Sequence, residues 1–388
     1  MTVYMDNSAT SRIQKSVLDE MLPYLSEEFG NPSSLYEAGL HAKKAMQTAR
    51  EKIAKLLNCE MNEIYITSGG TEADNWAIKG YLFANQNKGK HIITSAIEHP
   101  AVLRTCEFMK KSGYRVTVLQ PDENGYITAE NVETAITPDT AFITIQYANN
   151  EIGTIQPIAE IAEVATKHGI AFHTDAVQAV GTIPINLKGI PVTMLSASAH
   201  KFGGPKGIGF LYVKDGTELE SLLHGGPQEK RMRAGTENVP SIIGMAKALE
   251  LSLEEEYAEV KRIRDHMEKR ILKEIPDVKI NGGTDLEENA AGSEISSPRR
   301  LPGNLNVSFA DVEATALLVY LDLAGIAVSG GSACSSAENK PSEVLKAIGV
   351  CEPYLSGSVR FSLGTDNTME EANYVVDRLV ETVRKLRH

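Results

Sequence analysis

The sequence predicts an α/β fold with a seven-stranded, mainly parallel sheet flanked by helices, plus a smaller α+β domain. Two observations support this prediction. Seven short apolar segments recur up to residue 213, and most are separated by stretches long enough to form a helix. Polar clusters directly follow several of these segments, as expected for loops at the carboxyl ends of parallel strands. The expected strands are 64–67, 91–94, 115–119, 141–146, 171–174, 193–197 and 210–213.

The helices are predicted from the spacing of apolar residues. Between Gly39 and Leu57, apolar side chains recur at intervals of three and four residues, which places them on one helical face. An amphipathic helix is also expected over 15–25, after a polar turn. The remaining expected helices are 72–85, 101–111, 158–168 and 250–275, the last of them continuous. These elements indicate a large domain at 15–255 and a small domain formed by 1–14 and 256–388.

The composition is that of an ordinary globular protein and narrows the function classes. Of 388 residues, 42% are hydrophobic and 23% charged, and no apolar run approaches the length of a membrane span. The formal charge of −12 argues against a general nucleic-acid surface. The four cysteines lack disulfide or metal-ligand spacing, so we expect no metal site and a reducing, cytoplasmic location.

The first chemical signal is the glycine-rich stretch 196–209. A run of small residues ends at Lys201, and four glycines follow within eight positions, so backbone and ligand can approach closely. The hydroxyl of Ser198 and the imidazole of His200 could face an anion beside the lysine. Such a lysine suits Schiff-base formation. Taken alone, however, a lysine in this position is more often simply an exposed lysine in a glycine-rich loop.

Two further clusters add groups that bind anions and aromatic rings. Gly70 and Thr71 stand between an expected strand and an expected helix, where free backbone N–H groups can bind phosphate, although a simple helix cap is the alternative. Asp175 ends an apolar strand and needs a cationic partner, such as a protonated ring nitrogen or an internal salt bridge. His99 ends another strand and could stack on a ring or serve as a core histidine.

Together these groups could hold pyridoxal phosphate, and the chain resembles a known family that uses it. The sequence is similar to the class V aminotransferase family of fold-type I pyridoxal-phosphate enzymes, and within it to the NifS/IscS-like cysteine desulfurases. The resemblance covers nearly the whole length. Its motifs are Tyr4–Thr10, Asn149–Gly153, Arg233–Asn238 and Val359–Gly364, together with the clusters described above.

The resemblance implies a role for each matching residue. Lys201 would be the Schiff-base lysine, Asp175 the partner of the pyridine nitrogen, Gln178 the donor to the phenolic oxygen, and His99 the stacked catalytic base. The phosphate would be bound by Gly70, Thr71, Ser198 and His200. The substrate carboxylate would be held by Arg360 and Asn150, and Asn150 would also contact the cofactor.

Cys334 is the residue that selects the reaction. It lies in a small, polar, glycine-rich loop at about 329–341, which favours an accessible thiol over a buried one. The resemblance implies that L-cysteine displaces Lys201 from the cofactor, loses its α proton, and has its sulfur attacked by the Cys334 thiolate. L-alanine would leave, and a persulfide would remain on Cys334. A selenocysteine lyase or another class V enzyme is the alternative within the family.

The expected partners also come from the resemblance. Thr236 would reach the phosphate of a second subunit, which implies a homodimer with shared active sites. The sulfur would pass to an acceptor protein, either an iron-sulfur scaffold or a transfer-RNA thiolation enzyme. The chain departs from its relatives at Tyr36, where a histidine is common, and in a somewhat long insertion at 281–302. Two further alternatives are an assembly protein with little turnover and a nucleotide-binding protein, although the GxGxxG fingerprint is lacking.

Overall fold

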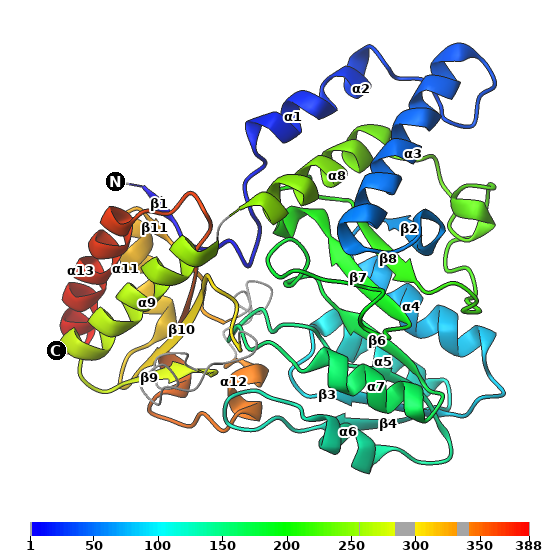
Figure 1. Ribbon diagram of the computed structural model, residues 1–388. Helices are drawn as coiled ribbons and strands as arrows, with labels where there is room; N and C mark the ends of the chain where they lie inside the picture. Colours follow the sequence, from blue (N-terminus) through cyan, green and yellow to red (C-terminus); the bar gives the residue numbers. More distant parts are fainter. Residues whose placement is uncertain (1, 256, 284–298, 332–340, 388) are drawn as a thin grey trace.

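The large domain is built on a seven-stranded sheet with the order β2-β8-β7-β6-β5-β3-β4 (Figure 1). The computed structural model describes residues 2–255, 257–283, 299–331 and 341–387. The strands are β2 (Ile64–Thr67), β3 (His91–Ser95), β4 (Arg115–Leu119), β5 (Thr140–Thr144), β6 (Ala171–Asp175), β7 (Met194–Ser198) and β8 (Gly209–Val213). The predicted seven-stranded, mainly parallel sheet is confirmed.

One strand of this sheet, β8, runs antiparallel to both of its neighbours, β2 and β7. The connection from β7 to β8 consists of the turn that contains Lys201 and the glycines after it, and it is too short for a helical crossover. A connection of this length can only return the chain in the opposite direction. Lys201 is therefore held between two paired strands.

Helices cover both faces of the sheet. They are α1 (Lys15–Met21), α2 (Pro23–Ser26), α3 (Glu37–Leu57), α4 (Gly70–Ala84), α5 (Pro100–Lys111), α6 (Ala129–Ala135), α7 (Ile158–Lys167) and α8 (Val239–Glu254). One hydrophobic cluster joins α3, α7 and α8 to the sheet, and a second joins α4 and α5 to it. The predicted layer order of helix, sheet and helix is therefore present.

The prediction of one continuous helix over 250–275 is wrong. Helix α8 ends at Glu254, and α9 spans Tyr257–Glu274. Glu255 between them has extended backbone angles, and its carboxylate accepts a hydrogen bond of 2.7 Å from Gln14. The sequence has no glycine or proline here, so a tertiary contact rather than helix propensity ends α8.

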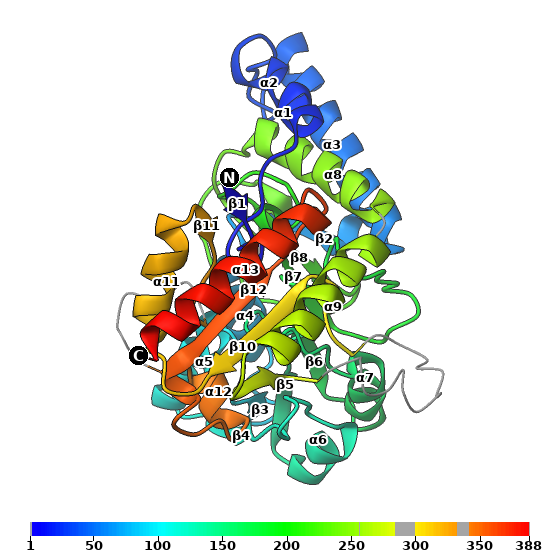
Figure 2. The same ribbon diagram turned by 90° about the vertical axis from the view of Figure 1, so that its left-hand side faces the viewer.

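The small domain contains a three-stranded antiparallel sheet with the order β12-β10-β9, and a separate parallel pair, β1 and β11. These strands are β1 (Val3–Tyr4), β9 (Val278–Asn281), β10 (Asn304–Phe309), β11 (Ile326–Ala327) and β12 (Ser358–Ser362). Its other helices are α11 (Ala314–Leu323), α12 (Glu343–Ala347) and α13 (Met369–Leu386). Helices α9 and α13 lie side by side over the sheet (Figure 2).

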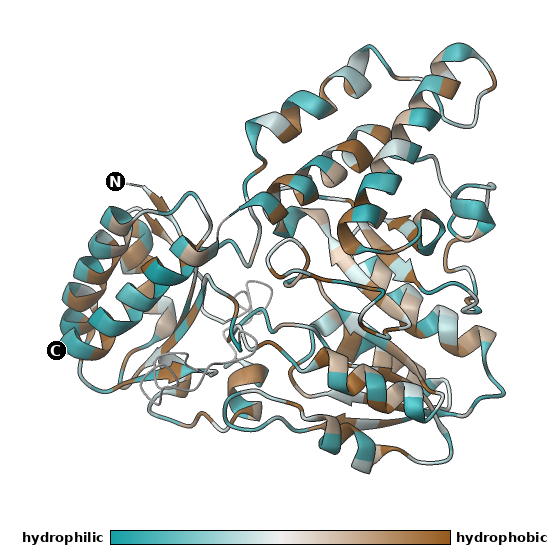
Figure 3. Ribbon diagram, viewed as in Figure 1, coloured by the Kyte–Doolittle hydropathy of each residue, from teal (hydrophilic) through white to brown (hydrophobic). Residues whose placement is uncertain are grey.

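The two domains have separate hydrophobic cores. The small-domain core takes Val3 and Met5 from the N-terminus and otherwise only residues from Val260 onward. Helix α13 contributes Val375 and Leu379 from its apolar face, while its other face is hydrophilic (Figure 3). On this basis we propose the domain limits predicted above, 15–255 and 1–14 with 256–388. Within the described residues, no helix is both long and apolar enough to cross a membrane.

Candidate active site

A cavity of about 360 Å³ lies where the carboxyl ends of β6 and β7 meet the N-terminus of α4. Ten of the predicted site residues line it: Gly70, Thr71, His99, Asn150, Asp175, Gln178, Ser198, His200, Lys201 and Arg360. Thr236 does not line the cavity and is exposed. Cys334 lies outside the described residues. The cavity therefore brings together groups that are up to 290 positions apart in the sequence, from Gly70 to Arg360.

Lys201 projects into this cavity from a short 3-10 turn that follows β7. Its Nζ donates hydrogen bonds to the backbone oxygens of Ser8 and Ala9, at 2.5 and 2.9 Å. Gln178 donates to the same Ser8 oxygen at 3.0 Å. Gly203 in the following turn has φ +80°, a conformation that favours glycine. The backbone carbonyl groups of residues 8 and 9 therefore hold Lys201 and Gln178 on one side of the cavity.

The N-terminus of α4 forms a cradle of backbone N–H groups. Gly69 precedes the helix, and no side chain caps its first turn. A Cβ atom on Gly70 would lie 2.6 Å from Cγ2 of Val177, so any larger residue would displace the wall of the cavity. Ser198 and His200 stand beside the cradle. Uncapped N–H groups, a helix dipole and nearby hydroxyls fit a phosphate group.

A glutamate in the first turn of α4, Glu72, lines the cavity and fixes the cradle. Glu72 accepts two hydrogen bonds from the Arg233 guanidinium, at 2.8 and 3.0 Å, and one from the Ser68 N–H at 2.9 Å. These bonds hold the pKa of Glu72 below its ordinary value despite partial burial. The cradle is thereby joined to the segment that continues to Thr236.

Asp175 and Asp74 form a buried acidic pair beneath the cavity. Asp175 accepts a hydrogen bond from the Val177 N–H at 2.9 Å, and burial raises its pKa, against the opposing effect of His99 and Lys201. Burial and the charge of Asp175 raise the pKa of Asp74 well above its ordinary value. Oxygens of the two carboxyl groups lie within 4.8 Å of each other, so ionisation of both buried groups is energetically unfavourable. A cationic ring nitrogen beside Asp175 would favour its ionised form.

His99 caps helix α5 through its own imidazole. Its Nδ1 accepts a hydrogen bond from the Ala101 N–H at 3.1 Å, so the neutral ring carries its proton on Nε2. Burial lowers the pKa of His99, which favours this neutral form. The donor atoms of Asp74, His99 and Asp175 lie within 4.8 Å of one another, a spacing that could ligate a metal ion. The expectation of no metal site stays a prediction.

Glu98, immediately before His99, is a further buried acid and should make folding stability depend on pH. Its Oε1 accepts hydrogen bonds from Ser95 Oγ and the Gln146 N–H, yet burial raises its pKa to about 8. A carboxyl whose pKa is raised on folding stabilises the fold at low pH, and this contribution is lost as pH rises towards 8. We therefore expect Glu98→Gln to flatten the decline in unfolding free energy between pH 5 and 8, by on the order of 1 to 4 kcal/mol.

Urea unfolding of the cofactor-free chain at pH 5 and pH 8 measures this difference. The exposed Glu107, which pairs with Arg104 on the surface, provides the matched control as Glu107→Gln. Equal pH dependence in wild type and Glu98→Gln would contradict the prediction.

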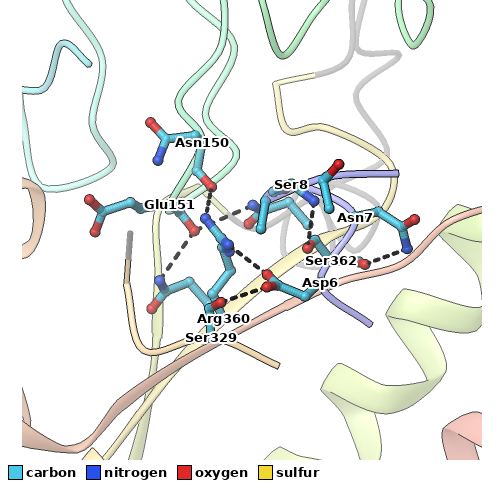
Figure 4. Close-up of polar contacts among 12 residues, drawn as sticks. Asp6, Asn7, Ser8, Asn150, Glu151, Ser329, Arg360 and Ser362 are labelled. Atoms are coloured by element: carbon cyan, nitrogen blue, oxygen red, sulfur yellow. Dashed lines mark hydrogen bonds and ion pairs between the residues drawn. The ribbon is translucent and has the colours of Figure 1, made fainter. Parts of the chain in front are cut away.

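Arg360 reaches the cavity from β12 of the small domain and is almost completely buried. Its Nη2 pairs with Asp6 Oδ1 at 2.7 Å, and its Nη1 donates to the backbone oxygen of Asn150 at 2.9 Å (Figure 4). Its Nε is buried without a hydrogen-bond partner among the described residues. A buried guanidinium N–H without an acceptor is costly, so this edge of Arg360 is suited to an anionic ligand.

The turn 149–153 places Asn150 beside Arg360. The side-chain oxygen of Asn149 accepts hydrogen bonds from the N–H groups of Glu151 and Ile152, at 2.8 and 2.9 Å. A Cβ on Gly153 would lie 2.7 Å from the side chain of Asn304, so only glycine allows the turn to dock on β10. Local hydrogen bonds and one glycine thus explain this sequence motif.

Several polar residues in and around the cavity were not predicted, among them Asp6, Glu72, Asp74 and Glu98. Asp6 and Glu98 had a signal, because they stand within motifs that were noted for their neighbours. Asp74 had none, because an acid inside a helix normally faces solvent. Only the packing of α4 against the sheet shows that Asp74 is buried.

The chain is similar to known proteins over nearly its whole length. Residues 3–375 match the family Aminotransferase class-V. The chain is 48% identical, over 99% of its length, to the cysteine desulfurase IscS of Clostridium botulinum strain Hall, of which the match covers 95%. A solved structure titled NifS-like protein superimposes with a TM-score of 0.90 and 35% identity, over 99% of this chain and all of that chain. A structure of SspA in complex with cysteine gives a TM-score of 0.81 and 38% identity, over 93% of this chain and 99% of that chain.

Proposed function

The chain belongs to the class V aminotransferase family, and from that premise we propose that it is a cysteine desulfurase dependent on pyridoxal phosphate. The reaction converts L-cysteine into L-alanine and leaves a persulfide on Cys334. The observation that carries the proposal is the convergence on one cavity of an amine, a buried acid, an imidazole, an uncapped helix N-terminus and an arginine whose buried Nε has no hydrogen-bond partner among the described residues.

The cavity residues have the donor and acceptor chemistry that pyridoxal phosphate requires. The cradle at Gly70 and Thr71 would hold the phosphate with Ser198 and His200, and Asp175 would hold the protonated ring nitrogen. Bound pyridoxal phosphate supplies an electron sink for the bonds at the substrate α carbon. Lys201 would supply the amine that holds the cofactor and would act as the base for the α proton.

The other two side chains in contact with the cofactor would orient it. Because Nδ1 of His99 already accepts a backbone hydrogen bond, its Nε2–H is the group free to donate while the ring stacks. This geometry favours His99 as a proton donor and stacking partner rather than as the base. Gln178 would donate to the phenolic oxygen after exchanging its bond to Ser8.

L-Cysteine is the proposed substrate, and its carboxylate would bind the guanidinium of Arg360 next to Asn150. The unpaired Nε of Arg360 supports this assignment. In the transfer step, the Cys334 thiolate forms a bond to the substrate sulfur while the bond between that sulfur and Cβ breaks. The electron pair remains on the carbon, which gains a proton, and L-alanine leaves. L-Cysteine and the thiol thus become L-alanine and a persulfide, without an external oxidant.

A homodimer and a sulfur acceptor complete the proposal. The segment from α1 to the start of α3, including the loop between α2 and α3, exposes several large apolar side chains that a second copy of the chain could cover: Leu22, Leu25, Phe29, Leu35, Tyr36 and Leu40. Thr236 is exposed at the end of the segment fixed by Arg233, as a residue that reaches a partner subunit must be. The acceptor is an iron-sulfur scaffold or a transfer-RNA thiolation enzyme, and we place the protein in the cytoplasm.

The decisive test measures alanine and protein-bound sulfur together. Wild-type protein incubated with L-cysteine should release alanine, and the peptide that contains Cys334 should gain the mass of one sulfur atom until a thiol reductant removes it. A Cys334→Ala chain should show neither. Alanine formation without sulfur on Cys334 would replace the desulfurase with a lyase, and no alanine at all would refute the proposed reaction.

A further inference from the structure

The chain on either side of residues 332–340, the range that contains Cys334, is tied to the surroundings of Arg360. Ser329 precedes this range and Ser342 follows it, and each hydroxyl donates to a different carboxylate. The two carboxylates are Asp6 and Glu151, both drawn beside Arg360 in Figure 4. Asp6 lies near the N-terminus, just after β1, and Glu151 lies in the turn 149–153 that follows β5.

Asp6 makes the first tie by using both of its oxygens. Oδ1 pairs with Arg360 Nη2 and Oδ2 accepts a hydrogen bond from Ser329 Oγ, each at 2.7 Å. The backbones of Ser329 and Arg360 also form an antiparallel bridge. The carboxylate side chain is only 15% exposed. One carboxylate therefore fixes the guanidinium and the chain that leads to residue 332 relative to each other.

Glu151 makes the second tie. Its Oε2 accepts a hydrogen bond of 2.5 Å from Ser342 Oγ, and the same hydroxyl accepts from the Leu345 N–H at the start of α12. The backbone oxygen of the preceding residue, Asn150, holds Arg360 Nη1. The side chains of Asn304 and Asn306 donate to the Glu151 carbonyl and fix its backbone to β10.

We propose that Asp6 and Glu151 are positioning residues that couple the substrate-carboxylate site at Arg360 to the chain segments on either side of Cys334. This inference rests on the proposed function, because it assigns Arg360 to the carboxylate of L-cysteine. Neither acid touches the reacting atoms. Each acts through a serine hydroxyl, which fixes Ser329 and Ser342, on either side of the range 332–340, relative to Arg360.

The physical reason is the steep dependence of group transfer on geometry. A misplacement of about 1 Å between reacting groups can cost on the order of 100-fold in rate. A thiol and a substrate held by independent elements would meet in the correct geometry only in a small fraction of arrangements. Asp6 binds both Arg360 and Ser329, and Glu151 binds Ser342 from the turn whose Asn150 carbonyl binds Arg360. The described residues on either side of 332–340 are thereby fixed relative to Arg360, which restricts this freedom.

The first test separates substrate binding from sulfur transfer. In Ser329→Ala and Ser342→Ala, we expect the dissociation constant of L-cysteine, followed by cofactor absorbance, to stay within about twofold of wild type. Single-turnover alanine formation should slow by roughly tenfold. In Asp6→Asn the arginine loses its charged partner, so L-cysteine should also bind roughly tenfold more weakly.

A second pair of variants distinguishes the hydrogen bond from the bulk of the side chain. Glu151→Ala should slow transfer, whereas Glu151→Gln should restore most of the rate because an amide oxygen can still accept from Ser342. Hydrogen exchange in the cofactor-free chain gives a readout independent of turnover. Exchange at Ser329 and its neighbours should accelerate in Asp6→Asn, and exchange at 343–346 should accelerate in Ser342→Ala.

Ser221→Ala is the matched control, since that exposed hydroxyl bonds only a nearby backbone oxygen. Wild-type transfer rates in both Ser329→Ala and Ser342→Ala would overturn the proposal. Equal losses of substrate binding and transfer in every variant would also overturn it, because they would indicate a loosened fold. If wild type makes no alanine from L-cysteine, the proposed function is refuted. The hydrogen bonds of Asp6 and Ser342 are tested separately: unchanged hydrogen exchange at Ser329 in Asp6→Asn and at 343–346 in Ser342→Ala would refute their role.

Discussion

Replacing Lys201 with alanine should lower alanine production from L-cysteine by on the order of 10³-fold or more. The site offers no second amine in its place, because among the described residues Lys201 is the only lysine that lines the cavity. The substitution removes both the group that joins the cofactor and the base for the α proton. The role as a base alone contributes on the order of 10² to 10⁴ in rate.

The measurement is a comparison of turnover and of covalent trapping. Borohydride reduction of wild type should place a pyridoxyl group on Lys201, and Lys201→Ala should retain none after dialysis. Lys206 in the same turn is exposed and does not line the cavity, so Lys206→Ala is the matched control. If Lys201→Ala keeps more than a few per cent of wild-type turnover, another residue carries the amine chemistry and our assignment fails.

The strands and the residues at their ends could be predicted because each depends on local sequence. Asp175 ends a five-residue strand that is buried throughout, and Lys201 follows shortly after another such strand. In a parallel sheet, those ends must lie at one edge. The antiparallel direction of β8 could also be inferred, since the turn between Ser198 and Gly209 is too short for a crossover.

The contacts that join distant segments could not be predicted. Asp6 and Arg360 are 354 positions apart, and no local pattern indicates which arginine an N-terminal acid will meet. The end of α8 at Glu254 was missed for the same reason. Its neighbour Glu255 meets Gln14 from the far end of the chain, and such tertiary contacts override helix propensity.

The burial of acidic side chains was the feature of the site that the sequence predicted least well. Asp74 and Glu98 sit among Asp175, His99 and His173, and burial lowers the pKa of His173 to about 3, so this histidine provides no positive charge. The sequence shows these residues only as ordinary polar positions. Their effect on one another exists only once α4 and the strands are packed.

Asp175→Asn should change activity and stability in opposite directions. The asparagine oxygen can still accept the hydrogen bond from the Val177 N–H, so the fold should persist. The neutral amide cannot hold a protonated ring nitrogen, so turnover with L-cysteine should fall by on the order of 10³-fold. The cofactor-free chain, by contrast, should become more stable at pH 8, because the substitution removes a buried carboxyl whose pKa is raised by desolvation.

The direction of this stability change follows from proton binding. A carboxyl with a raised pKa in the folded chain retains its proton where the unfolded chain has already lost it, so folding stability falls as pH rises above the ordinary carboxyl range. Thermal unfolding of wild type and Asp175→Asn without cofactor, at pH 5 and pH 8, should show the larger difference at pH 8. A variant that is less stable at both pH values would mean that Asp175 is held ionised by His99 and Lys201 before any cofactor binds. In that case the charge needed for the ring nitrogen would be an intrinsic property of the folded chain. We expect the reverse: Asp175 destabilises the cofactor-free fold, and bound cofactor removes this destabilisation.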